Sequence, residues 1–213
     1  MASRGLVVGG RALAVGAHPD DAEFGCFGTL QRFEAKAVLV LSAGEMGGPP
    51  DKRRLEAAEA AETVGAELEV GGLPDTALAV APAADAISEA VARFEPDVVF
   101  CPSPGDEHQD HATVARACRL ATRGFAGLVL AYLTPSAAAR FRPHLFVGLD
   151  EPEWETKLAA LDAHRSQCHR PYLSREHIDV TARYWALQGG GAMARAEPFE
   201  VLRWVEPAAG VAE

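Results

Sequence analysis

The chain has 213 residues, 48% of them hydrophobic and 23% charged, which is the composition of a globular protein with one sizeable core. Its formal net charge of −10 excludes the basic surface that nucleic acid binding requires, so no nucleic acid is expected as a partner. The four cysteines are scattered without a Cys-x-x-Cys pair, which favours reduced, buried thiols. With no apolar run long enough to span a membrane and no signal-peptide pattern, we expect a cytoplasmic protein.

Short apolar runs alternate with segments of helical periodicity along most of the chain. In chain order, the pattern predicts strand 11–17, helix 21–35, strand 36–41, helix 51–64, strand 67–70, helix 82–94, strand 98–101, helix 112–122, strands 128–133 and 145–149, helix 151–164 and strand 199–205. This alternation is typical of βα units. We therefore predict a single domain over 1–213, a Rossmann-like three-layer α/β sandwich with a mostly parallel sheet and an active site at the carboxyl ends of its strands. Residues 1–10 and 207–213 are expected to be mobile, although 6–8 could add an edge element.

The first two helices carry more detailed expectations. In helix 21–35, Asp21 or an adjacent residue is expected to cap the start, and Gly25 and Gly28, both poor helix formers, predict close packing on the sheet. In helix 51–64, Leu55 should mark the face that packs on the core, and Gly65 should end the helix.

Two polar motifs each follow an expected strand. His18-Pro19-Asp20-Asp21 comes directly after the first strand, and His108-Gln109-Asp110-His111 follows strand 98–101 across a short loop. If these strands are neighbours, the motifs share the crevice at the carboxyl ends of the sheet, where open α/β folds bind ligands. Histidines and carboxylates gathered there are typical of a zinc site, in which three such ligands leave one position open.

Each motif also has a simpler interpretation. Two aspartates before a helix commonly form an exposed turn with a capping carboxylate, and two loop histidines can simply be solvated. His108 and His111 lie three residues apart, however, so both imidazoles can approach one point. The occurrence of both motifs after strands favours the metal site. Nucleotide binding is weakly supported, because neither a G-x-G-x-x-G motif nor a P-loop is present, and G-x-S-x-G is also missing.

Ala17-His18-Pro19-Asp20-Asp21 and His108-x-Asp110-His111 resemble the two signature motifs of the LmbE/PIG-L-type zinc N-deacetylases. The similarity extends over most of the chain. Supporting matches are Ser42-Ala43-Gly44-Glu45, Arg53-x-x-Glu56-Ala57 with Val64-Gly65, Leu73-Pro74-Asp75, Lys157 with His164-x-Ser166-Gln167, and Ala196-Glu197-Pro198-Phe199. Two departures are Gln109, where the family usually has proline, and Ser42-Ala43, which matches loosely.

The resemblance implies a hydrolase that removes acetyl from N-acetylglucosaminyl compounds with one Zn²⁺ per chain, or another divalent ion such as Fe²⁺. Asp20 would be the general base, His108 the general acid and oxyanion stabiliser, and Asp110 the residue that orients a histidine. This division is chemically consistent, because a carboxylate that is not a ligand must take the proton of the attacking water. The implied metal ligands are His18, Asp21 and His111.

Other polar residues are assigned more loosely. Glu45, Arg53 and Asp75 are candidates for binding sugar hydroxyls or an anionic aglycone, although a solvated helix charge would also explain Arg53. His164 and Gln167 could line the site or pack beneath it, and we favour a supporting role. The remaining histidines are expected at the surface or in packing; they are His144, His169 and His177. The expected partner is a small N-acetylated amino sugar, and a homo-oligomer is compatible with the resemblance.

Three alternatives remain open from the sequence. Two histidines and one carboxylate are also the ligands of non-haem Fe(II) oxygenases, although such an enzyme has no evident use for Asp20. A metal-dependent amidase acting on a non-sugar amide would need the same groups. The third alternative, a metal- or sugar-binding homologue without turnover, is disfavoured because the polar residues of the implied mechanism are all present.

Overall fold

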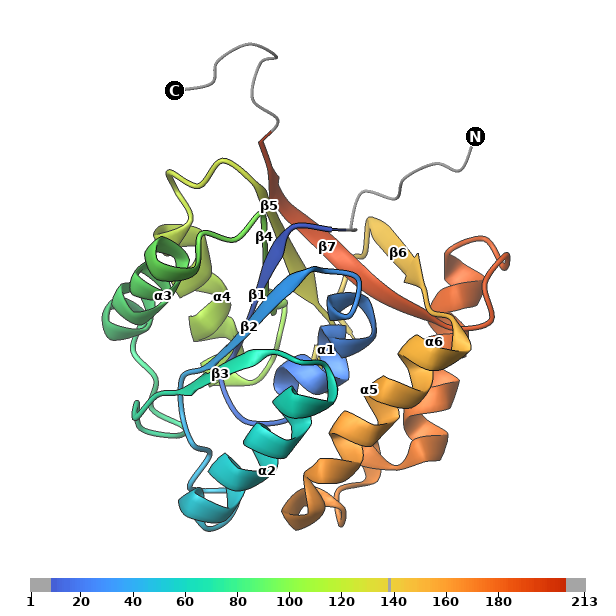
Figure 1. Ribbon diagram of the computed structural model, residues 1–213, viewed down its shortest axis with the longest axis horizontal. Coiled ribbons are helices and arrows are strands. Elements are labelled where there is room, and N and C mark those ends of the chain that lie inside the picture. The colour runs from blue at the N-terminus through green and yellow to red at the C-terminus, as the bar shows by residue number, and fades with distance from the viewer. Residues whose placement is uncertain (1–8, 138, 206–213) are drawn as a thin grey trace.

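The computed structural model describes residues 9–137 and 139–205, which are organised around a seven-stranded sheet (Figure 1). The strands are β1 (Arg11–Gly16), β2 (Ala35–Val40), β3 (Glu67–Val70), β4 (Val98–Pro102), β5 (Leu128–Tyr132), β6 (Leu145–Gly148) and β7 (Ala196–Trp204). Their spatial order is β3-β2-β1-β4-β5-β7-β6. The first five strands pair in parallel, and β7 runs antiparallel to both of its neighbours.

Helices cover both faces of this sheet (Figure 1). One face packs against α3 (Val80–Phe94) and α4 (Gln109–Ala121), and the other against α1 (Asp21–Leu30), α2 (Pro50–Thr63) and α5 (Glu151–Ala163). A further helix, α6 (Arg175–Gln188), shares a third apolar cluster with α1 and α5. Because successive strand residues point to opposite faces, neighbours such as Leu13 and Ala14 enter different clusters. The continuous apolar runs of the sequence follow from this two-sided burial.

The two predicted motifs emerge at the same edge of the sheet. Strands β1 and β4 are parallel neighbours, with Ala12 beside Val98. The chain leaves β1 toward α1 on one face of the sheet and leaves β4 toward α4 on the other. This divergence makes the gap between the ends of β1 and β4 a topological switch point, which is the usual ligand site of open α/β sheets.

The predicted fold class is confirmed, and every expected strand and helix occurs, strand 67–70 with its predicted bounds and the others with shifted ends. The helix expected over 21–35 ends at Leu30, and α4 begins at Gln109 rather than at 112. The sequence did not predict α6. The suggested edge element at 6–8, the mobile end 207–213 and most of the mobile start lie outside the described residues. Three cysteines are buried as expected, whereas Cys168 is exposed. Within the described ranges, no helix has the length and apolar character needed to cross a membrane.

Helix α2 presents a different face to the protein from the one predicted. Leu55 is 68% exposed, whereas Arg53 and Glu56 are only 4% and 3% exposed, so the predicted apolar face around Leu55 is wrong. Arg53 donates to the carbonyl oxygens of Pro19 and Gly44, and Glu56 accepts from the backbone N–H of Ser166. Arg53 and Glu56 therefore face the interior of the protein, where their hydrogen bonds fix loops near the carboxyl ends of the strands.

Gly25 and Gly28 lie at close contacts between α1 and its neighbours, as the sequence predicts. A Cβ on Gly25 would lie 2.1 Å from the ring of Tyr132, and one on Gly28 would lie 2.5 Å from Leu149. The Tyr132 ring is fixed, because it is fully buried and its hydroxyl donates to the carbonyl oxygen of Val15 at 2.9 Å. Glycine is therefore required where α1 crosses β5.

Substituting Gly25→Ala tests this contact. Alanine favours a helix over glycine by about 1 kcal/mol, but the clash with Tyr132 should outweigh this gain, because overpacking a core costs about 1–3 kcal/mol. We expect a lower free energy of unfolding in a urea titration. Gly124→Ala is the matched control, since a Cβ there meets no atom within 4 Å. Equal stability of the two variants would show that the α1–β5 contact is not tight.

Candidate active site

The loop after β1 presents two adjacent carboxylates in different environments. Asp20 precedes α1 with a φ of 97°, in the left-handed region, a conformation that costs a non-glycine residue about 1–3 kcal/mol. The side chain of Asp20 makes no capping hydrogen bond to α1, so the prediction that a carboxylate caps this helix is wrong. The Oδ2 of Asp21 instead accepts the backbone N–H groups of Ala17 and His18, each at 2.9 Å. The strained turn thus folds Asp21 back onto the end of β1.

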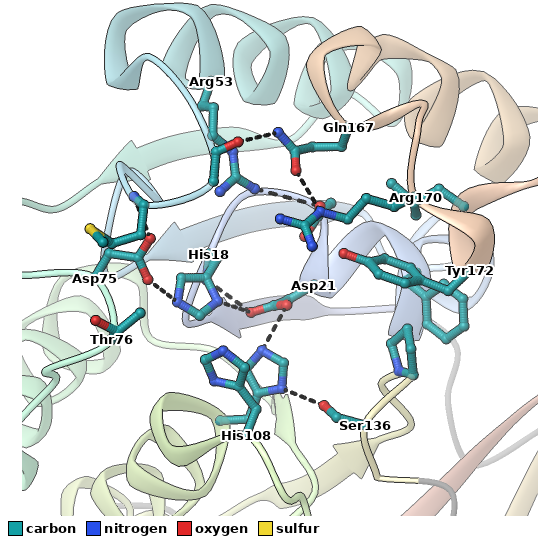
Figure 2. A pocket seen from close by; sticks show the side chains of 17 residues that line it. His18, Asp21, Arg53, Asp75, Thr76, His108, Ser136, Gln167, Arg170 and Tyr172 are labelled. Carbon is teal, nitrogen blue, oxygen red and sulfur yellow. Dashed lines mark hydrogen bonds and ion pairs between the residues drawn. The ribbon is translucent and has the colours of Figure 1, made fainter.

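His18 lies between carboxylates on both sides of its ring (Figure 2). Its Nε2 is 3.1 Å from Asp110 Oδ2 and 2.9 Å from Asp75 Oδ1. Its Nδ1 faces the Oδ2 of Asp21 at 3.8 Å. Burial alone would lower the pKa of His18, but the hydrogen bond to Asp110 and the charge of Asp21 raise it above its ordinary value.

His111 repeats this arrangement from the first turn of α4. Its Nδ1 is hydrogen-bonded to Asp106 Oδ2 at 2.9 Å, and its Nε2 lies 3.0 Å from Asp21 Oδ1. Burial opposes the charged form, but the charge of Asp21 and the hydrogen bond to Asp106 raise the pKa of His111 to about 10. The Nε2 contact lacks hydrogen-bond geometry, so among the described residues that buried nitrogen has no hydrogen-bond partner.

Asp106 and Asp110 are themselves fixed by the backbone. Asp110 accepts the N–H groups of Thr76 (2.7 Å) and Leu78 (3.2 Å), and Asp106 accepts that of His108 (2.8 Å). A carboxylate held in this way sets the tautomer and direction of the imidazole that it contacts, as is typical around metal-binding histidines. Sequence reasoning did not single out Asp106; its only signal was its position in the loop between β4 and the second motif.

These groups could hold a divalent metal ion. Each of His18 and His111 has one nitrogen held by an aspartate and the other directed at Asp21. A buried nitrogen without a hydrogen-bond partner, such as His111 Nε2, is unusual unless something else satisfies it. Imidazole nitrogen and carboxylate oxygen are donors that suit zinc. In the described part of the chain, ligating atoms lie within 4.8 Å of one another in two groups, His18, His108 and His111, and His18, Asp75 and Asp110.

His108 occupies the N-cap position of α4 beside these residues. Its ring stacks on that of His111 at a centroid distance of 4.5 Å. Burial and the neighbouring His111 and His18 lower the pKa of His108. Its Nδ1 accepts the backbone N–H of Asp110 at 3.2 Å, which places the proton of the neutral ring on Nε2. His108 therefore enters the cavity as a neutral N–H donor.

Asp20 is buried beside a guanidinium. Arg53 Nη2 lies 3.5 Å from Asp20 Oδ2, while the same group donates to Pro19 O at 2.6 Å and Nη1 donates to Gly44 O at 2.9 Å. Burial and the adjacent charge of Asp21 raise the pKa of Asp20 to about 6, although Arg53 opposes this. The contacts of Asp21, by contrast, lower its pKa below the ordinary value. The pKa values of the two neighbouring aspartates are therefore shifted in opposite directions.

A cavity of about 500 Å³ opens over these groups (Figure 2). Of the predicted site residues, it is lined by His18, Asp20, Asp21, Arg53, Asp75, His108 and His111. Asp110 lies behind His18, and Glu45 is not part of the lining. The carboxylate of Glu45 accepts the backbone N–H of Asp75 at 2.9 Å, and this bond lowers the pKa of Glu45. Glu45 therefore stabilises the position of the loop that carries Asp75.

The late segment of the chain supplies a second wall. His164 is buried beneath the site, where its Nε2 is 2.9 Å from Glu23 Oε1, whereas Gln167 lines the cavity. Lining residues that the sequence did not single out are Phe24, Met46, Gly47, Thr76, Pro135, Ser136, Arg170, Tyr172 and Leu173. Phe24 lies on α1, and the others lie in loops and a short 3₁₀ turn without periodicity, so nothing in the sequence places those others at the cavity.

The role of Asp106 can be tested by metal titration. Asp106→Asn keeps the size of the side chain but weakens its hold on His111, so we expect divalent metal affinity to fall by about 10- to 100-fold. Glu107→Gln is the control, because it removes the same charge from an exposed neighbour. Unchanged zinc affinity in Asp106→Asn would mean that His111 does not depend on this carboxylate.

Comparisons with known proteins agree with this site. The family model "PIG-L: GlcNAc-PI de-N-acetylase" matches residues 13–122, just over half of the chain. "Uncharacterized deacetylase YaiS" from Escherichia coli K12 is 33% identical over 168 residues, which are 72% of this chain and 90% of that protein. The family match spans both motifs of the site.

Solved structures share the whole fold. The conserved protein TT1542 from Thermus thermophilus is 30% identical, with a TM-score of 0.77 over 95% of this chain and 99% of that one. At about 20% identity, where likeness shows the fold alone, N,N'-diacetylchitobiose deacetylase from Pyrococcus horikoshii has a TM-score of 0.76 over 90% of this chain and 83% of that one. The hydratase GalB from Pseudomonas putida KT2440 is 22% identical, with a TM-score of 0.76 over 94% and 100%. The family match and the E. coli relative place the chain in the PIG-L (LmbE-type) deacetylase family, as its two motifs predict.

Proposed function

We propose that the protein is a metal-dependent deacetylase that hydrolyses the acetamide of an N-acetylglucosamine-type sugar. The observation that carries this proposal is that His18 Nδ1 and His111 Nε2 both face the carboxylate of Asp21. The carboxylate of Asp20 lines the same cavity beside them. Membership in a family named for N-acetylglucosaminyl de-N-acetylation supports the substrate class.

The metal would be held by His18 Nδ1, Asp21 and His111 Nε2. The alternative group of His18, Asp75 and Asp110 is less suited, because both oxygens of Asp110 accept backbone N–H groups, whereas only Oδ2 of Asp21 does. A bound Zn²⁺, or another divalent ion such as Fe²⁺, would polarise the acetamide carbonyl and make water more acidic. Asp106 and Asp110 would act through the histidines that they orient.

Asp20 would take the proton of the attacking water on its carboxylate. Arg53 holds this group in place and its charge opposes protonation, so the base stays ionised as the pH falls toward 6. His108, with its Nε2–H, would donate a hydrogen bond to the developing oxyanion. The proton that Asp20 takes from water would pass to the departing nitrogen, because a neutral imidazole cannot give up its only N–H proton. Asp75 would meet sugar hydroxyls at the cavity wall, while Glu45 would act through Asp75 and Arg53 through Asp20.

Acetate release from N-acetylglucosamine and its glycosides, with zinc content measured on the same samples, tests this proposal. Asp20→Asn should retain zinc but lose turnover by about 10²- to 10⁴-fold, the usual contribution of a general base. His18→Ala should lose both zinc and turnover. Loss of zinc in Asp20→Asn would instead mean that Asp20 is a ligand and that the roles of Asp20 and Asp21 are wrongly assigned.

The same assay separates the alternatives. Faster release from simple acetamides than from sugars would identify an amidase for non-sugar substrates. Sugar binding without acetate release would identify a homologue that has lost turnover. Because GalB shares the fold, addition of water to an unsaturated carboxylate, without acetate release from any amide, would contradict deacetylation altogether.

A further inference from the structure

One wall of the cavity carries a cation for which the proposed deacetylation has no use. Arg170 follows the short 3₁₀ turn Arg165–Gln167 and lines the cavity beside Gln167 and Tyr172 (Figure 2). Its Nε donates to Gln167 Oε1 at 3.0 Å. Within the described ranges, this is the only side-chain hydrogen bond of its guanidinium, which forms no ion pair. Its two terminal nitrogens are therefore available to a ligand.

A series of contacts fixes this guanidinium. Gln167 is 1% exposed, and its Nε2 donates to Gly47 O at 3.2 Å and to Ser166 Oγ at 2.9 Å. The backbone N–H of Ser166 donates to the buried carboxylate of Glu56 on α2 at 2.8 Å. Because Gln167 binds Nε, it restrains the guanidinium and leaves the two terminal nitrogens to a ligand. A guanidinium edge presented in this way matches the two oxygens of a carboxylate or phosphate.

Tyr172 adds a second donor on the same wall. Burial and the charge of Asp20 raise the pKa of Tyr172 to about 12, although the nearby charge of Arg170 opposes this. Its hydroxyl is therefore protonated at neutral pH. Among the described residues, this hydroxyl has no hydrogen-bond acceptor, so it can donate to the same group as Arg170.

The other arginine of the cavity cannot serve this purpose. The sequence suggested Arg53 as a partner for an anionic aglycone. Its Nη groups, however, already donate to the carbonyl oxygens of Pro19 and Gly44 and contact the carboxylate of Asp20. The remaining charged groups of the lining are the carboxylates Asp20, Asp21 and Asp75 with the histidines. These carboxylates would repel an acidic substrate unless a cation faced its acidic group.

We propose that Arg170, positioned by Gln167 and assisted by Tyr172, binds a carboxylate or phosphate of the substrate. The substrate is then an acidic derivative of an N-acetylated amino sugar. This inference rests on the proposed function and narrows its substrate class.

Acetate release from sugars that differ in charge tests the inference. The probes are N-acetylglucosamine, its 1-phosphate, its 6-phosphate and N-acetylmuramic acid. We expect at least one acidic sugar to exceed N-acetylglucosamine in kcat/KM by about tenfold or more, as a charge-assisted bidentate contact allows. Arg170→Gln should remove this advantage, mainly through KM, and leave N-acetylglucosamine within about twofold of its original rate; Arg170→Lys should keep part of it.

Arg165→Gln is the matched control, because Arg165 lies on the same turn but is 62% exposed and pairs with Glu59 outside the cavity. It should leave the preference for the acidic sugar intact. Equal kcat/KM for neutral and acidic sugars in the original protein would overturn the inference while deacetylation stands. The same preference in Arg170→Gln as in the original protein would also overturn it.

Calorimetric binding of the same sugars keeps the two proposals separate. If no sugar releases acetate, the proposed function fails, and binding alone then decides the role of Arg170. Binding of an acidic sugar that Arg170→Gln weakens by about tenfold would support the anion site without turnover. Absence of binding, or binding unaffected by Arg170→Gln, would overturn it.

Discussion

The site depends on the buried carboxylate of Asp21, which joins the loops at the ends of β1 and β4. One of its oxygens accepts the backbone N–H groups of Ala17 and His18, and the other faces Nε2 of His111. These contacts fix the carboxylate in its ionised form, with a pKa below the ordinary value despite burial. Because β1 and β4 are neighbours whose helices leave on opposite faces, a single carboxylate can reach both motifs.

The different environments of adjacent residues explain how one short motif can supply two functions. Asp21 receives N–H groups and faces two imidazoles, so it is suited to hold a cation. Asp20, turned away by a left-handed backbone, is buried near Arg53 and has a raised pKa, which suits a group that takes up a proton. The left-handed backbone at Asp20 thus accompanies different partners for the two carboxylates, Arg53 for Asp20 and backbone N–H groups for Asp21.

The sequence predicted the fold and both motifs because each depends on a local pattern. Strand and helix periods, and the position of each motif after a strand, were enough to place His18 and His111 in one crevice. Asp106 could not be predicted from such a pattern, since an aspartate in an irregular loop has no period. Leu55 was misplaced because an amphipathic pattern assumes that apolar residues face inward, whereas α2 buries Arg53 and Glu56 to hold loops.

The late part of the chain was least predictable for a related reason. Helix α6 contains β-branched and aromatic residues that favour strands, and its position depends on packing with α1 and α5. Arg170 reaches the cavity because Ser166 binds Glu56 on α2, a contact between residues 110 positions apart, and Gln167 on the same turn binds Arg170. Long-range polar contacts of this kind leave no signature in a single sequence.

The most direct test of this account is the position of the metal. Crystals of the zinc-loaded protein, measured above and below the zinc absorption edge, would locate the ion by its anomalous signal. The account predicts one ion bound by His18 Nδ1, Asp21 and His111 Nε2, with Asp106 and Asp110 still on the opposite ring nitrogens. An ion held instead by His18, Asp75 and Asp110 would contradict the central role of Asp21.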